Sequence, residues 1–220
     1  LKNLVNPFEG ISRVKFTVGH PVSTIQRFTN QNRNYSFLVQ GTSGKKGLKR
    51  LFLGSVAEEV LRFSKIPVMT LGPEAQKTVS KSRLEQQKKP IILLATDFGK
   101  TSLVTEKVAL KLAKALNGKI HLVHHLRAGF HPLIQTAVAT PSGSRELQEL
   151  VLHLKHEAQK SLEKRASRLR KTGVDLSQAL LEKGTSASEA LIQEAKKVEA
   201  SLIILGTHAR SLPVASFLGS

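Results

Sequence analysis

The 220-residue sequence contains no cysteine and no tryptophan, and only one methionine and one tyrosine. Without cysteine the chain has no disulfide bonds and no thiolate chemistry, which fits an intracellular compartment. Aromatic residues make up 5% of the chain, so the stacking platform of a single-strand nucleic-acid binder is not predicted. No apolar run approaches the roughly 18 residues of a membrane span. No membrane partner is therefore expected.

Acidic residues are scarce. The chain has 16 Asp and Glu against 34 Lys and Arg, giving a formal net charge of +18 and a sequence pI near 10.4. Such a balance favours polyanionic partners such as nucleotides, phosphate or nucleic acid. The basic residues are dispersed, as in KSRLEQQKK and EKRASRLRK, which is also typical of a solvated basic surface. Hydrophobic residues make up 40% of the chain, enough to predict a packed core.

Strand and helix patterns alternate along the chain. Apolar runs predict strands at 14–18, 35–40, 68–71, 91–95, 119–125, 176–182 and 201–205. Amphipathic stretches predict helices at 23–32, 56–64, 102–116, 145–171 and 186–198, the last with Ser and Glu as caps. The charged stretch 74–90 lacks periodicity and predicts a linker between a first part at 1–73 and a second at 91–220. This order predicts an α/β fold with a parallel, doubly wound sheet.

An internal repeat links the two parts. GTSGKKGLKRLFLGS at 41–55 aligns without a gap with GTHARSLPVASFLGS at 206–220, and the strands and helices before them align as well. The spacing is Gly-x2-Gly-x9-Gly-Ser in the first copy. The second copy keeps this spacing but has Ala209 at the second glycine position.

A glycine-rich loop between a strand and a helix can form an anion cradle. Glycines allow positive φ and close backbone approach, and the free N–H groups of a helix N-terminus attract phosphate. Ser55 can donate its hydroxyl and also cap the helix. The spacing is neither that of a P-loop nor GxGxxG, and an ordinary turn explains one copy alone. Recurrence at the matching junction favours the cradle.

On these residues the chain resembles the universal stress protein family. The signature of that family is Gly-x2-Gly-x9-Gly-Ser/Thr, on a five-stranded parallel sheet of the adenine-nucleotide alpha hydrolase-like type. The stretch GTSGKKGLKRLFLGSVAEEVLRFSKIPVMTL is similar to the end of the family domain. IILLATDFGKTS is similar to its opening strand, which ends in an Asp before a Ser/Thr-rich helix start. The resemblance covers nearly all of both parts except the linker, and it implies a tandem repeat with incomplete copies.

The resemblance implies binding of an adenine nucleotide, with ATP as the expected ligand and the need for Mg²⁺ left open. The residues it implies are Gly41, Gly44, Gly54, Ser55 and Val56 in the first copy, and Asp97, Val123, Gly206, Gly219 and Ser220 in the second. Glycines and serines would hold phosphates and ribose, whereas Asp97, with Val123 nearby, would meet the adenine or ribose end. Ala95 replaces a family proline, and Pro213 interrupts the second loop.

Compared with the family, the first copy lacks its opening strands and the second lacks its last helix and strand. We expect a fragment of a longer tandem protein, cut at both ends. In the alternative, the first part supplies the elements that the second lacks, as in a circular permutation. A sheet edge left by truncation is prone to pairing, so a homodimer or pairing of the two copies within the chain is expected.

The leading hypothesis is a cytoplasmic regulatory module of the stress response. The first alternative is a weak nucleotide hydrolase, but no catalytic residue or metal ligand is identifiable, so a non-enzymatic role is preferred. The second is a basic protein associated with nucleic acid, indicated by charge alone. His121, His124, His125 and His131 cluster, yet hydrogen-bonded polar residues are the default interpretation. For Asp97, capping of the next helix competes with ligand binding.

Overall fold

The computed structural model describes residues 16–31, 35–42, 53–72, 75, 89–126, 145–182 and 186–206. The chain forms two compact units, residues 1–86 and 87–220, and each is considered by itself. Among the described residues no helix combines the length and the apolar character needed to cross a membrane. The finer division into 1–73, a linker at 74–90 and 91–220 stays a prediction.

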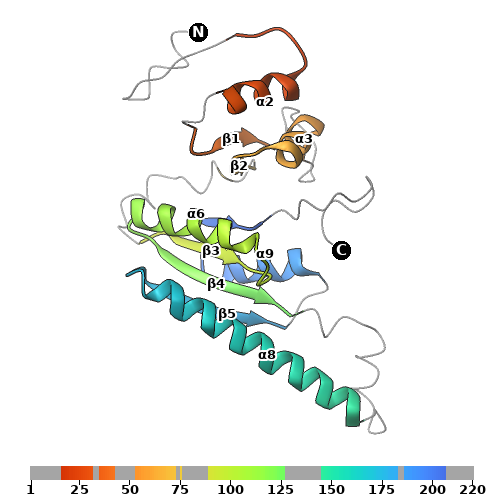
Figure 1. The fold of residues 1–220 in the computed structure, drawn as a ribbon, viewed down its shortest axis with the longest axis vertical. Helices are drawn as coiled ribbons and strands as arrows, with labels where there is room; N and C mark the ends of the chain where they lie inside the picture. The colour runs from red at the N-terminus through yellow and green to blue at the C-terminus, as the bar shows by residue number, and fades with distance from the viewer. Residues whose placement is uncertain are drawn as a thin grey trace. The chain divides into compact units, whose positions relative to one another are not determined.

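The first unit pairs two short strands beside two helices (Figure 1). Its described elements are α2 (Pro21–Gln31), β1 (Leu38–Gly41), α3 (Ser55–Phe63) and β2 (Val68–Leu71). The strands run parallel, with Gln40 opposite Thr70. The Gln40 amide ties strand to helix, because Nε2 donates to the Ala57 carbonyl at 3.0 Å and to Thr70 Oγ1 at 3.3 Å. Val22, Ala57 and Val60 are the buried apolar residues between α2 and α3.

The strand predicted at 14–18 is wrong in its described part. Phe16 to Val18 has no strand conformation, and both of these apolar side chains are exposed. Alternation of apolar residues predicts a strand only where a neighbouring strand supplies hydrogen bonds and a covered face. The described residues of this unit provide neither for Phe16 and Val18.

The second unit is a four-stranded sheet with three helices. Its elements are β3 (Ile91–Ala95), α6 (Ser102–Ala115), β4 (Lys119–His125), α8 (Arg145–Arg170), β5 (Leu176–Leu181), α9 (Ala187–Lys197) and β6 (Leu202–Ile204). The strand order is β5-β4-β3-β6 and every pairing is parallel. The predicted parallel α/β fold is confirmed. The described residues of this unit hold four strands, at the four places predicted for the second part, and the five-stranded sheet implied by the resemblance stays an expectation.

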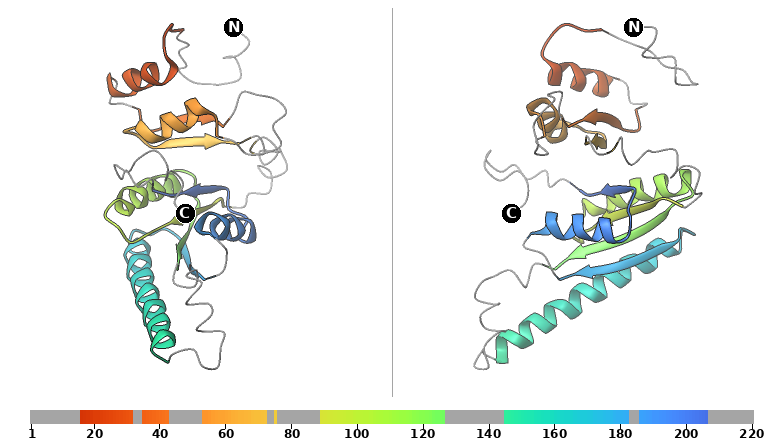
Figure 2. Two further views of the ribbon diagram at one scale, coloured as in Figure 1. Left: turned by 90° about the vertical axis from the view of Figure 1, so that its right-hand side faces the viewer. Right: turned by 180° about the vertical axis from the view of Figure 1, so that it is seen from behind.

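Helices cover both faces of this sheet (Figure 2). On one face Leu94 and Leu122 pack with Ala109 of α6 and Leu162 of α8. On the other face Leu93 and Val123 pack with Ala190 of α9. The run IILLA therefore forms a strand buried on both sides, as its unbroken apolar character predicts.

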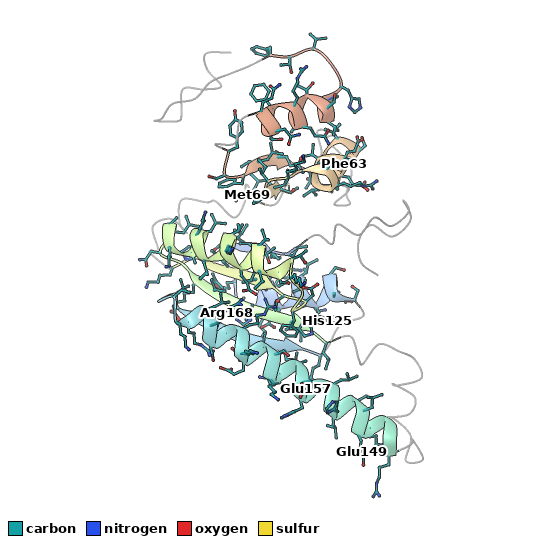
Figure 3. All side chains as sticks on the ribbon, in the orientation of Figure 1. Phe63, Met69, His125, Glu149, Glu157 and Arg168 are labelled. Carbon is teal, nitrogen blue, oxygen red and sulfur yellow. The ribbon has the colours of Figure 1, made fainter. Side chains whose placement is uncertain are left out.

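Helix α8 extends beyond the sheet at its N-terminal end, where Glu149 and Glu157 lie (Figure 3). Its C-terminal half buries Ala158, Leu162, Ala166 and Leu169, which are spaced as one helical stripe. Leu150 and Leu152 in the N-terminal half are exposed. Among the described residues, the buried apolar stripe of α8 lies in its C-terminal half.

The internal repeat is also a repeat of structure. The alignment that pairs Gly206 with Gly41 places α9 on α2 and β6 on β1, and both helices have 11 residues. Each helix precedes a strand that ends at or just before the paired glycine. The two units therefore share a helix–strand module, and the tandem arrangement predicted from sequence is confirmed.

Candidate functional site

The strand order of the second unit locates its candidate site. The chain steps from β3 to β4 to β5 and then returns through α9 to place β6 beside β3. In open parallel sheets, ligands bind beyond the carboxyl ends of the strands where the order reverses. Here that position lies after β3 and β6. Asp97 follows β3, and Gly206 follows β6.

Asp97 lies exposed in a tight turn that leads into α6. Its Oδ1 accepts hydrogen bonds from the Gly99 N–H at 2.9 Å and from the Ser102 hydroxyl. The Ser102 oxygen in turn accepts from the Asp97 N–H at 3.3 Å. The N-cap residue of α6 is Thr101, which makes no side-chain cap bond. The Asp97 carboxylate therefore organises the turn and accepts from the hydroxyl of Ser102, the first residue of α6.

Glycine is needed two residues after Asp97. A Cβ at Gly99 would lie 3.0 Å from Asp97 Oδ1, closer than ordinary van der Waals contact. Only glycine lets this backbone approach the carboxylate without displacing it. The sequence Asp-Phe-Gly thus fixes how the carboxylate is presented.

Phe98 holds the left-handed backbone conformation, with φ of 62°. For a residue that is not glycine this region costs on the order of 1–3 kcal/mol, so other contacts must stabilise it. The Phe98 N–H donates to Thr96 Oγ1 at 3.1 Å, and the Phe98 carbonyl accepts from Arg165 Nη2 at 2.7 Å. Hydrogen bonds from a charged donor contribute about 1.5–3 kcal/mol, which is enough to offset the backbone cost.

Arg165 is itself held by a buried carboxylate. Its Nη1 donates to Glu106 of α6, whose side chain is 3% exposed, and Arg168 donates to the other carboxylate oxygen. The Arg165 side chain is 16% exposed, whereas that of Arg168 is 53% exposed. Each Glu106 oxygen thus accepts from a different guanidinium, and this pairing offsets the cost of burying the carboxylate charge. This ion-pair group joins α6, α8 and the Asp97 turn.

His124 supports the same turn from β4. Its ring lies over the Phe98 ring, with centroids 4.2 Å apart, and its Nδ1 donates to the Thr96 carbonyl at 2.7 Å. Because a carbonyl only accepts, the proton of the neutral ring is on Nδ1. Burial lowers the pKa of His124 below 6.5, against the smaller raising effects of the Thr96 hydrogen bond and the Asp97 charge. Near pH 7 this imidazole is therefore neutral.

The other predicted residues of this unit lie at different depths. Gly206 is exposed, and a Cβ there would lie 3.5 Å from Thr105 Cγ2 of α6, so the end of β6 approaches the first turns of that helix. Val123 is fully buried in the core on the α9 face. Its carbonyl accepts from the Thr96 N–H at 2.9 Å. Val123 thus reaches the turn through its backbone alone. Gly219 and Ser220 lie outside the described residues.

In the first unit, backbone contacts bring the ends of the glycine loop together. The Gly54 N–H donates to the Thr42 carbonyl at 2.6 Å, and the Thr42 N–H donates to Leu71 at 3.1 Å. Gly54 is thereby held against Thr42, the residue after Gly41, beside the exposed Ser55 and Val56 of α3. This arrangement places a strand end beside a helix N-terminus. Gly44 lies outside the described residues.

Two details of the predicted cradle need correction. Gly54 has φ of −63° and neither it nor Gly41 has positive φ, so conformational freedom is not what these positions use. A Cβ at Gly54 would lie 3.2 Å from the Thr42 carbonyl, so close approach is the constraint there. Gly54 is also the N-cap residue of α3, with no side-chain cap bond. Ser55, predicted to cap the helix, is its first residue.

Other polar clusters and hollows lie away from these junctions. His121 is buried, with Nδ1 2.7 Å from Ser177 Oγ and Nε2 3.1 Å from Glu194 Oε1. Within the described ranges no three His, Asp or Glu side chains are grouped to hold a metal ion. One hollow of about 490 Å³ lies between β5 and α9, and another of about 270 Å³ between α2 and α3. Neither is lined by a residue predicted to bind nucleotide.

Sequence reasoning missed the supports of the Asp97 turn. Glu106 falls on the stripe of α6 that also buries Ala109 and Ala113, and Arg165 adjoins the buried stripe of α8. A charge on an apolar stripe needs a partner of opposite sign. Two such charges on helices that cover one sheet face could have predicted the pair.

Comparisons with known proteins point to one family. The model of the universal stress protein family matches residues 3–71 and 90–220. A universal stress protein of Methanocaldococcus jannaschii is 40% identical over 53 residues, which are 24% of this chain and 31% of that protein. The match therefore spans less than a third of that relative's length.

Two solved structures of universal stress proteins are similar to this chain to different extents. A universal stress protein from Archaeoglobus fulgidus matches with a TM-score of 0.57 at 23% identity, over 86% of this chain and 56% of that one. One from Burkholderia pseudomallei matches with a TM-score of 0.44 at 27% identity, over 54% of this chain and 82% of that one. Because its identity is 23%, the Archaeoglobus fulgidus match is evidence for the fold alone. Because the family model matches most of both units, the chain belongs to the universal stress protein family.

Proposed function

We propose that this chain is a regulatory module of the stress response that binds an adenine nucleotide, with ATP as the ligand to test first. The observation that carries the proposal is the exposed Asp97 carboxylate, held at the sheet position where the strand order reverses. A carboxylate there accepts hydrogen bonds from ribose hydroxyls, as acidic residues do in other doubly wound nucleotide sites. Membership of the family supports the same ligand class.

The residues around Asp97 fit such a ligand. Gly206 follows the neighbouring strand β6 and has no side chain, so phosphate can approach its backbone beside the first turns of α6. Helix α6 has 14 residues and presents its N-terminal end at this junction. In the proposal Asp97 binds ribose or base, with Gly206, Gly219 and Ser220 on the phosphates.

The glycine junction of the first unit is proposed as a second phosphate cradle. Gly41 has open space around its Cα, and Gly54 brings the end of the loop onto the start of α3. With Gly44, Ser55 and Val56 these residues would surround a phosphate at the helix N-terminus. A cytoplasmic location and pairing of copies belong to the same proposal. No hydrolytic step is part of it.

The test is a titration of the full chain with ATP by calorimetry at fixed salt, comparing wild type, Asp97→Asn and Asp175→Asn. An asparagine oxygen can still accept from Gly99 and Ser102, so the turn remains while the negative charge is lost. We expect at least about a tenfold loss of affinity for Asp97→Asn. Asp175 is exposed and paired with Lys119 away from the site, so its variant is the matched control and keeps wild-type affinity.

The titration can also contradict the proposal. If wild type does not bind at millimolar ATP, or if Asp97→Asn binds as well as wild type, the site is not the one proposed. Slow turnover of ATP in the same samples would favour the hydrolase alternative. Binding of DNA that weakens steeply with salt, without ATP binding, would favour the nucleic-acid alternative, in line with the net charge of +18.

A further inference from the structure

We infer that Arg165 is a positioning residue of the nucleotide site, because its guanidinium holds the Asp97 turn in the conformation that presents the carboxylate. This inference rests on the proposed function. Arg165 is on α8, packed against the face of the sheet that α6 also covers, and among the described residues its bond to the turn is the one to the Phe98 carbonyl. It acts through the backbone and not by touching the ligand.

The link from Arg165 to Asp97 is short. The bonded carbonyl belongs to Phe98, the residue directly after Asp97, and its peptide also carries the Gly99 N–H that donates to Asp97 Oδ1. One peptide unit therefore receives the guanidinium on its oxygen side and orients the carboxylate on its nitrogen side. Rotation of this unit would break both bonds together.

Phe98 does not favour this backbone conformation by itself. Left-handed φ is disfavoured for a residue with a Cβ, and glycine is the residue that adopts it at no cost. The contacts that oppose relaxation are the Thr96 hydroxyl, the ring of His124 and the Arg165 guanidinium. Of these, only Arg165 binds the carbonyl that would move.

The planar fork of arginine suits this position. One nitrogen bonds Glu106 while the other bonds the Phe98 carbonyl, so the buried carboxylate fixes the direction of the second bond. A lysine ammonium is a point charge and cannot make both bonds in this fixed geometry. Arg165→Lys should therefore keep part of the ion pair but lose the hold on the turn.

Arg168 supplies a matched control. It lies about one turn further along α8 and bonds the same Glu106 carboxylate (Figure 3), but within the described part of the chain no hydrogen bond joins it to the turn. If the ion pair mattered only for packing of α6 on α8, loss of either arginine would affect the ligand alike. If Arg165 positions Asp97, the two variants differ.

The experiment measures ATP affinity of the full chain for wild type, Arg165→Met, Arg165→Lys and Arg168→Met, with a thermal melt of each. We expect about a tenfold weaker affinity for both Arg165 variants, in the range found for supporting residues of bound groups, and less than about a twofold change for Arg168→Met. Equal losses for Arg165→Met and Arg168→Met overturn the inference. Wild-type affinity in Arg165→Met overturns it too.

A second background tests the mechanism. Phe98→Gly removes the steric cost of the left-handed conformation that the Arg165 bond offsets. Adding Arg165→Met in this background should therefore change affinity by less than about twofold, against about tenfold in the native background. Additive losses contradict the inference. The variants need not share one melting temperature, because each comparison is between two proteins that differ only at Arg165.

The outcome separates this inference from the proposed function. If wild type does not bind ATP, the proposed function fails, and amide exchange of Gly99 by NMR decides the positioning role. Faster exchange of the Gly99 amide in Arg165→Met than in Arg168→Met supports it. Equal exchange in both variants refutes it.

Discussion

The junction between β1 and α3 in the first unit and the junction between β3 and α6 in the second are built differently. The first is closed by backbone atoms, with the Gly54 N–H on the Thr42 carbonyl. The second is organised by side chains that converge from three elements, Asp97, His124 and Arg165 among them. Both occupy the carboxyl end of a parallel strand, where ligands of such sheets bind.

This difference decides what each junction tolerates. A backbone junction depends on a missing side chain, so its sensitive positions are glycines. A side-chain junction depends on specific hydrogen-bond partners, and loss of one leaves a buried group unsatisfied. Substitutions should therefore affect the second junction more strongly and over a wider region of its unit.

The largest effect is expected for Glu106→Ala. This change removes the 3%-exposed partner of Arg165 and leaves a guanidinium without its carboxylate, which costs about 3–5 kcal/mol in buried pairs. Urea unfolding and hydrogen exchange of α6 and α8 measure the loss. The control is Glu163→Ala, since Glu163 pairs with Arg170 but is half exposed. A loss no greater than that of the control would show that Glu106 is not desolvated.

An intermediate effect is expected at the glycines of the first junction. Gly54→Ala should lower the stability of the first unit by about 1 kcal/mol, since alanine is a poor N-cap residue and its Cβ would press on the Thr42 carbonyl. Gly41→Ala should raise it by about 0.5 kcal/mol, because nothing lies within 4 Å of the added Cβ and the unfolded chain loses freedom. Hydrogen exchange of α3 and β2 compares them. If both substitutions change the stability in the same direction, close approach at Gly54 is not the constraint.

The smallest effect concerns pH and His124. Burial lowers its pKa in the folded state below 6.5, so below pH 6.5 the unfolded chain binds a proton that the folded chain does not. Stability should therefore be level above pH 6.5 and fall as pH drops from there to the folded-state pKa. His124→Gln should flatten this slope in urea midpoints measured from pH 7.5 to 5.5. His153→Gln, at an exposed position of α8, should leave it unchanged.

Most of the fold could be predicted from local pattern. The strands at 68–71, 91–95 and 119–125 have their predicted bounds, because Gly, Pro and Asn-Gly mark their ends clearly. The predicted Ser186 cap of α9 is confirmed by its bond from the Glu189 N–H at 3.2 Å. The strand expected at 14–18 failed because pairing is a tertiary property. Neither propensity nor alternation reports whether a partner strand is present.

The site was less accessible to sequence reasoning. The glycines were predicted from motif spacing and Asp97 from the family resemblance, and their role in nucleotide binding stays a prediction. The dependence of the Asp97 turn on Arg165 joins residues 67 positions apart through a main-chain carbonyl. Every residue has a main-chain carbonyl, so the pattern of side chains does not show which carbonyl Arg165 binds. The left-handed Phe98 was hidden for the same reason, since a phenylalanine gives no sign of that conformation.

The contact between the Phe98 ring and His124 has a practical consequence for optical work. The chain has no tryptophan, so an indole placed at position 98 would be the sole tryptophan fluorophore and would lie directly on the turn. Its emission would respond to the imidazole beneath it and to any molecule that settles against Asp97. The contact between these two tilted rings can thus report the state of the turn in solution.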